Sequence, residues 1–287
     1  MKKVLVTGSG GLLGRELMRF LEATGEPVTG WDLPEHDITR IEECINAIHE
    51  ENPEVIFHLA AWTDVDGCEA EPARALAVNF QGTWAVALGA AETGCKLVYL
   101  STDYVFDGRK RKPYRESDKP NPLSVYGRSK YLGEQVVMKN CRRYFIVRTS
   151  RLFGRHDRNF VNTILSRAKV DDELRVVNDQ TGSPTYAKDL CLPLVRLARS
   201  EHYGIYHLTN SGQCTWFEFA REIVRLAGLN CEVIPITTAE SGRRAPRPAY
   251  SVLDNHHYRR RFGLELRPWQ EALRSYLDEI QAAETGG

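Results

Sequence analysis

The sequence predicts an α/β fold in which a doubly wound parallel sheet carries a smaller C-terminal lobe. Short apolar runs alternate with helical patterns over the first 150 residues, and this alternation is typical of a parallel sheet with helices on both faces. A glycine-rich turn follows the first run, and polar residues stand where several later runs end. We therefore expect one domain over residues 1–150 and a lobe over residues 151–287, some of whose elements return to the sheet.

Composition narrows the functional class. The 287 residues contain 38 basic and 38 acidic side chains, so the net charge of zero gives no reason to expect a nucleic acid or a membrane surface as partner. Seven cysteines are scattered without a C-x-x-C pair, which is typical of reduced thiols in a cytoplasmic protein. The apolar runs are too short for a transmembrane helix.

The first strand, residues 4–6, leads into the turn T-G-S-G-G-L-L-G and then into a helix over 15–23. Strand, glycine turn and helix in this order are typical of a dinucleotide-binding, or Rossmann, unit. Gly8 would make the tight turn, Gly11 would let the backbone approach a pyrophosphate, and Gly14 would let the helix pack on the sheet. The spacing G-x-x-G-x-x-G differs from G-x-G-x-x-G, so a purely structural glycine turn remains the alternative.

The second strand, residues 27–31, ends at Asp32, which lies 18 residues past Gly14. A carboxylate at this point usually accepts the adenosine ribose hydroxyls, and because Leu33 rather than a basic residue follows, its charge favours NAD over NADP. Capping of a helix or of a turn is the alternative role for Asp32. Asp37 and Ile38 lie in the next loop and could reach an adenine; Asp37 could also cap the helix from about residue 41, and the two roles are compatible.

Three more strands are expected over residues 55–60, 96–100 and 144–148, separated by helices over 73–93 and 125–139. Ligands of such sheets bind at the carboxyl ends of the strands. The polar or small residues that follow these strands should therefore line one crevice, and they are Ala60, Ala61, Ser101, Thr102, Asp103, Thr149, Ser150 and Arg151.

Tyr126 and Lys130 are four residues apart in the helix expected over 125–139, so they share one helix face. A phenol beside an ammonium group should be a proton donor with a depressed pKa. This pair, with Thr102 at the end of a strand, indicates reduction of a carbonyl, for which a nicotinamide would supply the hydride.

The regular alternation of strand and helix patterns ends after about residue 150. Proline residues punctuate the second half, and we expect helices over 159–168, 187–199, 215–226 and 267–280 with short strands at 176–177 and 206–208. Trp216 and Phe219 fit the apolar stripe of a core helix better than a stacking platform.

Taken together, these residues resemble the extended short-chain dehydrogenase/reductase family and, within it, the dTDP-4-dehydrorhamnose reductase family. The matching motifs occur in order over nearly the whole chain. They include T-G-S-G-G-L-L-G, A-A-W-T-D-V-D (60–66), S-T-D-Y-V-F-D-G, Y-G-R-S-K-Y-L-G-E, R-T-S (148–150), D-Q-T-G-S-P-T (179–185) and R-P-A-Y-S-V-L-D (247–254).

The resemblance implies roles for individual residues. Tyr126 would donate the proton, Lys130 would hold the nicotinamide ribose and lower the pKa of Tyr126, and Thr102 would orient the reacting group. Further cofactor contacts would come from Leu12, Leu13, Ala60, Ala61, Thr63 and Asn79, and substrate contacts from Val65, Asp103, Tyr104, Arg151 and Arg247. The cofactor would be NADPH or NADH, because the family leans toward NADPH or dual use.

The resemblance implies reduction of the C4 keto group of a nucleotide-linked 6-deoxysugar, a small-molecule substrate. The alternatives are an epimerase or dehydratase of nucleotide sugars, or a non-catalytic subunit resembling the methionine adenosyltransferase β subunit. The family can form homodimers and bind Mg²⁺ through carboxylates; Glu16 matches one of these, but Lys188 stands where another would align, so we expect no metal. Arg247, with Arg243 and Arg244 nearby, would bind a diphosphate or form a structural salt bridge.

Arg151 departs from the family pattern Arg-Thr-Ser-Trp. An arginine at the crevice would favour a more polar or charged sugar over a bare 6-methyl face. In the alternative, Arg151 turns outward and pairs with Asp157 or another surface acid.

Overall fold

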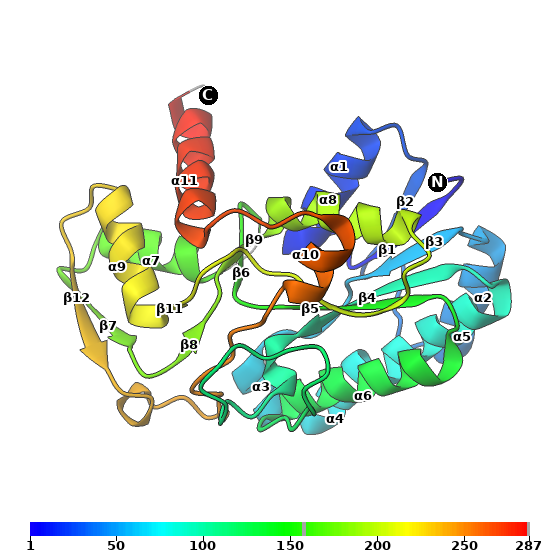
Figure 1. The fold of residues 1–287 in the computed structure, drawn as a ribbon, viewed down its shortest axis with the longest axis horizontal. Coiled ribbons are helices and arrows are strands. Elements are labelled where there is room, and N and C mark those ends of the chain that lie inside the picture. Colours follow the sequence, from blue (N-terminus) through cyan, green and yellow to red (C-terminus); the bar gives the residue numbers. More distant parts are fainter. Residues whose placement is uncertain (157–158, 286–287) are drawn as a thin grey trace.

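A six-stranded parallel sheet is the centre of the computed structural model, which describes residues 1–156 and 159–285 (Figure 1). Its strands run in the spatial order β10-β5-β4-β3-β1-β2. Their bounds are β1 (Val4–Thr7), β2 (Val28–Trp31), β3 (Val55–His58), β4 (Lys96–Thr102), β5 (Tyr144–Thr149) and β10 (Gly204–His207). Thr7 is level with Trp31 and His58, and Thr102 is level with Thr149, so the carboxyl ends of these strands lie along one edge.

Helices cover both faces of the sheet, as the alternation predicts. Val4 and Val6 of β1 pack into a core with one helix layer, whereas Leu5 between them packs into the core on the opposite face. The first layer holds α1 (Leu12–Ala23) and α8 (Ala187–Arg199), and the second holds α2 (Ile41–Glu51), α5 (Thr83–Thr93) and α6 (Val125–Asn140). The predicted doubly wound sheet is confirmed.

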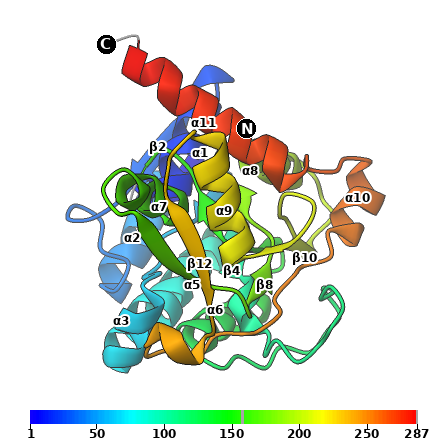
Figure 2. The same ribbon diagram turned by 90° about the vertical axis from the view of Figure 1, so that its left-hand side faces the viewer.

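The second half of the chain builds a smaller body beside the sheet (Figures 1 and 2). It has its own apolar core, which includes Phe153, Leu174, Phe219 and Tyr276. Its main elements are α7 (Phe160–Ala168), β7 (Glu173–Val177), α9 (Trp216–Leu226), β12 (Glu232–Ile236) and α11 (Trp269–Thr285). Because β10 pairs with β5 and α8 packs on the sheet, elements of this half do return to the sheet. The boundary at residue 150 remains a prediction.

The helix expected over residues 73–93 is divided into α4 (Pro72–Leu76), a wider π-helical segment (Ala77–Gly82) and α5. The wider segment contains Asn79, whose side chain is held by the backbone of Trp62. The remaining short elements were not expected: α3 (Val65–Ala70), β6 (Leu152–Phe153), β8 (Thr181–Gly182), β9 (Thr185–Tyr186), β11 (Cys214–Thr215), α10 (His256–Phe262) and two single 3₁₀ turns (Asp103–Val105 and Ala239–Ser241).

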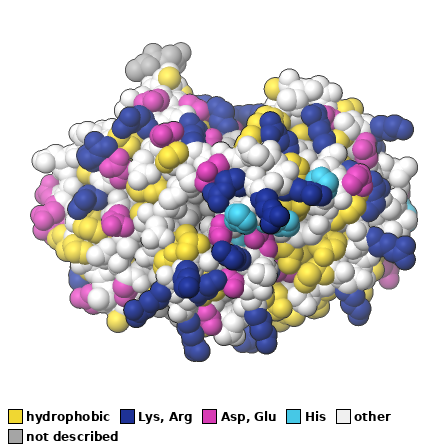
Figure 3. Space-filling model, viewed as in Figure 1, with side chains coloured by type: hydrophobic (Ala, Val, Ile, Leu, Met, Phe, Trp, Pro, Cys, Tyr) yellow, Lys and Arg dark blue, Asp and Glu magenta, His cyan; other side chains and the backbone are white. Residues whose placement is uncertain are grey.

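Charged side chains of both signs are interspersed over the face in Figure 3, with basic side chains and histidines gathered near its middle. The seven-residue helix α10 carries two histidines and three arginines. Arg259 of this helix pairs with Glu265 at 2.9 Å, which offsets part of the local charge. In the described part of the chain, no helix is long and apolar enough to cross a bilayer.

Candidate active site

A cavity of about 890 Å³ lies at the carboxyl ends of the strands, within the size range of small-molecule and cofactor sites. It brings together nearly all the residues that the sequence singles out. These are Gly8, Gly11, Leu12, Leu13, Gly14, Asp32, Asp37, Ile38, Ala60, Ala61, Thr63, Val65, Thr102, Asp103, Tyr104, Tyr126, Lys130 and Arg151. Two predicted residues, Asn79 and Arg247, are not among its lining residues.

The glycine turn between β1 and α1 forms one end of the cavity. Gly8 has a positive φ of 72°, and a side chain on Gly14 would place its first carbon 2.0 Å from the carbonyl oxygen of Gly8. Helix α1 begins after Gly11, and no described side chain caps its first N–H groups. Uncapped N–H groups at a helix start are suited to a phosphate. This cradle fits the pyrophosphate of a dinucleotide.

Asp32 lies beside this turn at the end of β2. Its Oδ2 accepts a hydrogen bond from the Gly10 N–H at 2.7 Å, and its Oδ1 accepts one from the Leu33 N–H at 2.8 Å. The carboxylate therefore fastens the glycine turn and also lines the cavity, so the structural role and the cofactor position coincide.

Asp37 accepts hydrogen bonds from the backbone N–H and the hydroxyl of Thr39 at 2.9 and 2.7 Å. It does not cap α2, whose N-terminal cap is Arg40. The capping alternative for Asp37 is therefore wrong, because its carboxylate closes a local turn instead.

Thr102, Tyr126 and Lys130 meet at the other end of the cavity. Thr102 is the last residue of β4, and Tyr126 is the second residue of α6, a helix that starts where the Ser124 hydroxyl accepts the Gly127 N–H. Lys130 lies one turn further on, and its Nζ lies 4.3 Å from the centre of the Tyr99 ring. The Tyr126 ring packs edge-on to the Tyr104 ring at 5.8 Å between centres.

Burial controls the proton affinities of this pair. Burial raises the pKa of Tyr126 well above its ordinary value, and the hydrogen bond with Thr102 only partly opposes this effect. Burial lowers the pKa of Lys130 to about 7, against the attraction of Glu134. The expected depression of the Tyr126 pKa is therefore wrong, because burial dominates the shift. A raised pKa keeps the phenol protonated and able to donate.

Asp103 follows Thr102 and is almost fully buried, with 3% of its surface exposed. It accepts hydrogen bonds from the hydroxyls of Ser150 at 3.0 Å and Thr102 at 3.1 Å. Burial raises the pKa of this carboxyl group, with the hydroxyl groups opposing. Asp103 thus ties the ends of β4 and β5 together at the cavity wall.

A buried ion pair beneath Lys130 was not expected. Glu134, one turn after Lys130, receives two bonds from the Arg148 guanidinium at 2.8 and 2.6 Å and one from the Ser101 hydroxyl at 2.6 Å. Both charged residues are at most 1% exposed. The pair fixes α6 against β4 and β5, and so fixes the height of Tyr126 and Lys130 over the sheet. The final glutamate of Y-G-R-S-K-Y-L-G-E and the arginine of R-T-S were the signals available in the sequence.

Asn79 lies behind the cavity rather than in it. Its amide accepts from the Trp62 N–H at 2.8 Å and donates to the Trp62 carbonyl at 3.0 Å and to the Ser129 hydroxyl at 3.0 Å. The predicted direct contact with the cofactor is thus not supported by its position. Asn79 instead holds the loop after β3, whose residues Ala60, Ala61 and Thr63 line the cavity.

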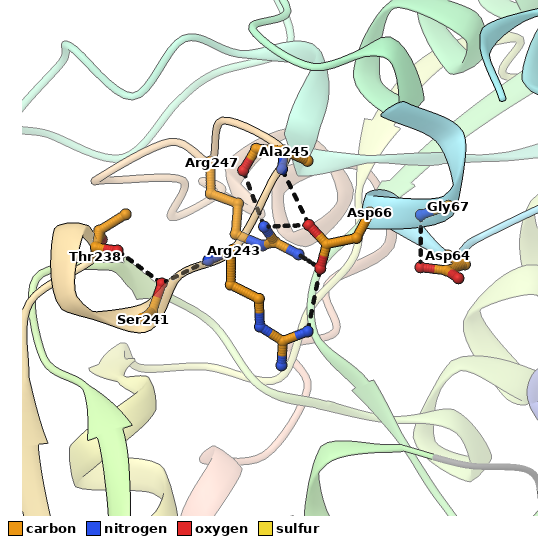
Figure 4. A network of polar contacts seen from close by, with 8 residues as sticks. All are labelled: Asp64, Asp66, Gly67, Thr238, Ser241, Arg243, Ala245 and Arg247. Carbon is orange, nitrogen blue, oxygen red and sulfur yellow. Dashed lines mark hydrogen bonds and ion pairs between the residues drawn. The ribbon is translucent and has the colours of Figure 1, made fainter. Parts of the chain in front are cut away.

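Arg247 also lies outside the cavity lining, because Asp66 holds it (Figure 4). The two terminal nitrogens of Arg247 donate to the Asp66 carboxylate at 3.1 and 2.9 Å, and Arg243 and the Ala245 N–H each donate to it as well. These donors, Arg247 first, hold the pKa of Asp66 far below its ordinary value. Of the two readings for Arg247, the structure contains the salt bridge, and diphosphate binding remains a prediction.

Arg151 faces the cavity. It has a positive φ of 48°, its terminal nitrogens donate to the carbonyls of Cys214 and Gln180 at 2.8 Å each, and its guanidinium stacks 4.0 Å from the centre of the Trp216 ring. Trp216 packs against the core of the second body, as its place in the apolar stripe predicts, and it also lines the cavity; Phe219 is fully buried as expected. Asp157, the alternative partner of Arg151, lies outside the described residues.

The residues considered for a metal are engaged elsewhere. Lys188 pairs with Glu279 at 2.7 Å, and Glu16 lies 3.3 Å from His156. Over residues 1–156 and 159–285, no group of three or more potential ligand side chains is close enough to hold a metal ion.

Comparison with known proteins gives one consistent family. Residues 1–282 match the RmlD substrate binding domain. The chain is 43% identical to the spore coat polysaccharide biosynthesis protein SpsK of Bacillus subtilis (strain 168), with 99% of each chain covered. It is 39% identical to a dTDP-4-dehydrorhamnose reductase of Aggregatibacter actinomycetemcomitans, with 96% of this chain and 98% of that one covered. Among solved structures, dTDP-4-dehydrorhamnose reductase from Bacillus anthracis strain Ames in complex with NADP superposes with a TM-score of 0.95 at 40% identity, covering 97% of this chain and 100% of that one.

Proposed function

The chain belongs to the RmlD substrate binding domain family, and from this premise we propose that it is an NAD(P)H-dependent reductase of a nucleotide-linked 4-keto-6-deoxysugar. The favoured reaction converts dTDP-4-dehydro-L-rhamnose to dTDP-L-rhamnose, in line with the names of its relatives. One observation carries the proposal: a single cavity extends from the glycine turn and Asp32 to Thr102, Tyr126 and Lys130. A dinucleotide held at one end would present its nicotinamide to the reacting groups at the other.

In this proposal the bound nicotinamide supplies the hydride to C4 of the sugar. Tyr126 donates the proton of its hydroxyl to the carbonyl oxygen, and Thr102 holds that phenol by a hydrogen bond. The charge of Lys130 stabilises the phenolate that forms, which then regains a proton from solvent. The raised pKa of Tyr126 suits an acid that must begin each cycle protonated.

The substrate end is formed by Val65, Asp103, Tyr104 and Arg151, all of which line the cavity. We assign the sugar to this end because Asp103 and Tyr104 directly follow Thr102, and the Tyr104 ring packs against that of Tyr126. The seven free thiols favour a cytoplasmic protein. A homodimer remains a prediction, as does the lack of a metal and of a nucleic-acid partner.

The test is turnover by the purified protein, followed as loss of NADPH or NADH absorbance with dTDP-4-dehydrorhamnose as substrate. Tyr126→Phe should lower kcat by ~100-fold or more, the usual effect of losing a positioned acid. Tyr131→Phe, on the same helix but outside the cavity lining, is the matched control and should be close to wild type. Near-normal turnover of Tyr126→Phe would refute the catalytic assignment.

The same assay separates the alternatives. An epimerase would convert a nucleotide sugar without net consumption of reduced cofactor. A regulatory subunit would bind the dinucleotide and turn over no keto-sugar nucleotide with either cofactor. Either outcome would refute the proposed reductase.

A further inference from the structure

Two side chains of opposite charge meet at one residue of the glycine turn. The N–H of Gly10 is bound by the Asp32 carboxylate at 2.7 Å, and the carbonyl of Gly10 accepts from Nε of Arg15 at 2.6 Å. Both side chains line the cavity at its adenosine end. The residue after Asp32 is the uncharged Leu33, whereas the cation of this site comes from α1.

The terminal nitrogens of Arg15 remain available to bind an anion. The bond to Gly10 uses Nε, whereas a guanidinium binds phosphate through a fork that includes its terminal nitrogens. The side chain is exposed on the first turn of α1, so it is open to solvent and ligand. Asp32, in contrast, already accepts one backbone N–H on each oxygen, which offsets part of its negative charge.

Among the described residues that line the cavity, no other cation is placed to do the same. The lysine and the second arginine of the cavity lining, Lys130 and Arg151, belong to its reaction end. His36 is at the adenosine end, but its ring is stacked flat on Trp31 with 4.5 Å between centres.

We propose that Arg15 is the cofactor-selecting residue of this site: its guanidinium binds the 2′-phosphate of the adenosine ribose. NADP(H) is then bound at least as tightly as NAD(H), although the charge of Asp32 favours the unphosphorylated ribose. This inference rests on the proposed function, because it concerns the cofactor of that same reaction. A cation is needed here because a ribose phosphate carries up to two negative charges near neutral pH and lies beside a carboxylate.

The test measures binding rather than turnover. Titration calorimetry with 2′,5′-ADP and with 5′-AMP compares the adenosine half of the cofactor with and without the 2′-phosphate. Wild type is compared with Arg15→Gln, with the charge-conserving Arg15→Lys, and with Arg19→Gln. Arg19 is the matched control, because it is an exposed arginine one turn later on α1 and is not a lining residue.

We expect Arg15→Gln to weaken 2′,5′-ADP by about tenfold or more, equivalent to ~1.4 kcal/mol, while 5′-AMP changes less than about twofold. Arg15→Lys should recover part of the loss, and Arg19→Gln should bind both ligands like wild type. Equal weakening of both ligands by Arg15→Gln would show that Arg15 only supports the glycine turn, and unchanged 2′,5′-ADP affinity would show no role; either result overturns the inference alone. If wild type bound neither ligand, the proposed function would fail and the inference with it.

Discussion

Replacing Lys130 by methionine should make the cofactor-free protein more stable while it abolishes the proposed activity. Lys130 is 3% exposed, and burial lowers its pKa from 10.5 to about 7 even though Glu134 attracts the charge. A depressed lysine pKa means that folding disfavours the charged form. Methionine has nearly the same length and no charge, so it removes this cost without leaving a large cavity.

The size of the effect follows from the two pKa values. At 1.36 kcal/mol for each pH unit between 10.5 and about 7, the cost of the buried charge is at most about 5 kcal/mol, and about 2–5 kcal/mol is a reasonable expectation. The full cost applies below pH 7, where the lysine is charged in both the folded and unfolded states. Between pH 7 and 10.5 the unfolded chain binds the proton that the folded protein has released, so wild-type stability rises with pH and the advantage of Lys130→Met shrinks.

The assay is urea unfolding of the cofactor-free protein at pH 6 and pH 9. Lys139→Met, an exposed lysine near the end of the same helix, is the control and should show little change at either pH. Other titrating groups are common to all three proteins, so they cancel in the difference. The reasoning is refuted if Lys130→Met is less stable than wild type at pH 6, or if its advantage is the same at both pH values.

Three further outcomes are expected. Gly14→Ala should destabilise the fold by about 1–3 kcal/mol and weaken 5′-AMP binding, because the new methyl group would meet the backbone oxygen of Gly8. Thermal unfolding measures the stability and calorimetry the binding, and an unchanged melting temperature would contradict the prediction. Asp66→Asn should lower the free energy of unfolding by about 1–3 kcal/mol at neutral pH, because it loosens Arg247. Since folding lowers the pKa of Asp66, this difference in stability from wild type should diminish as the pH falls below 3.8. Arg151→Trp should raise kcat/KM for dTDP-4-dehydrorhamnose relative to more polar keto-sugar nucleotides, and an equal response of both substrates would show that Arg151 does not set specificity.

The sequence was informative wherever local patterning controls the structure. Apolar β-branched runs predicted the strands of the sheet, and the rule that ligands bind at carboxyl strand ends predicted which residues would share a cavity. Thr102 and Arg151 are far apart in the chain, yet both line it because they lie at the carboxyl ends of the neighbouring strands β4 and β5. These predictions need only the period of the hydrophobic pattern, the length of each apolar run and the parallel arrangement of the strands.

Contacts between distant segments could not be predicted in this way. The bond between Arg247 and Asp66 joins residues 181 positions apart, and it depends on how a loop of the second half packs on α3. Trp216 packs on the core as its spacing predicts, but its contact with Arg151 at the start of α9, where the helix meets the cavity, could not be predicted. Arg15 was missed because its relation to Asp32 runs through the folded glycine turn and not through adjacency in the chain.

The error about the Tyr126 pKa has a more general cause, because spacing shows which charges are close but not how dry their surroundings are. Tyr126 and Lys130 are neighbours as expected, and the Glu134 carboxylate one turn later should strengthen the positive charge. However, Arg148 binds both oxygens of Glu134, and burial outweighs the attraction that Glu134 exerts on the charge of Lys130. Burial therefore dominates, keeping the phenol protonated and the lysine near its titration point. For a residue that must donate a proton and a neighbour that must stabilise the resulting phenolate, burial is the main cause of this balance, and the spacing of the Tyr–Lys motif does not reveal it.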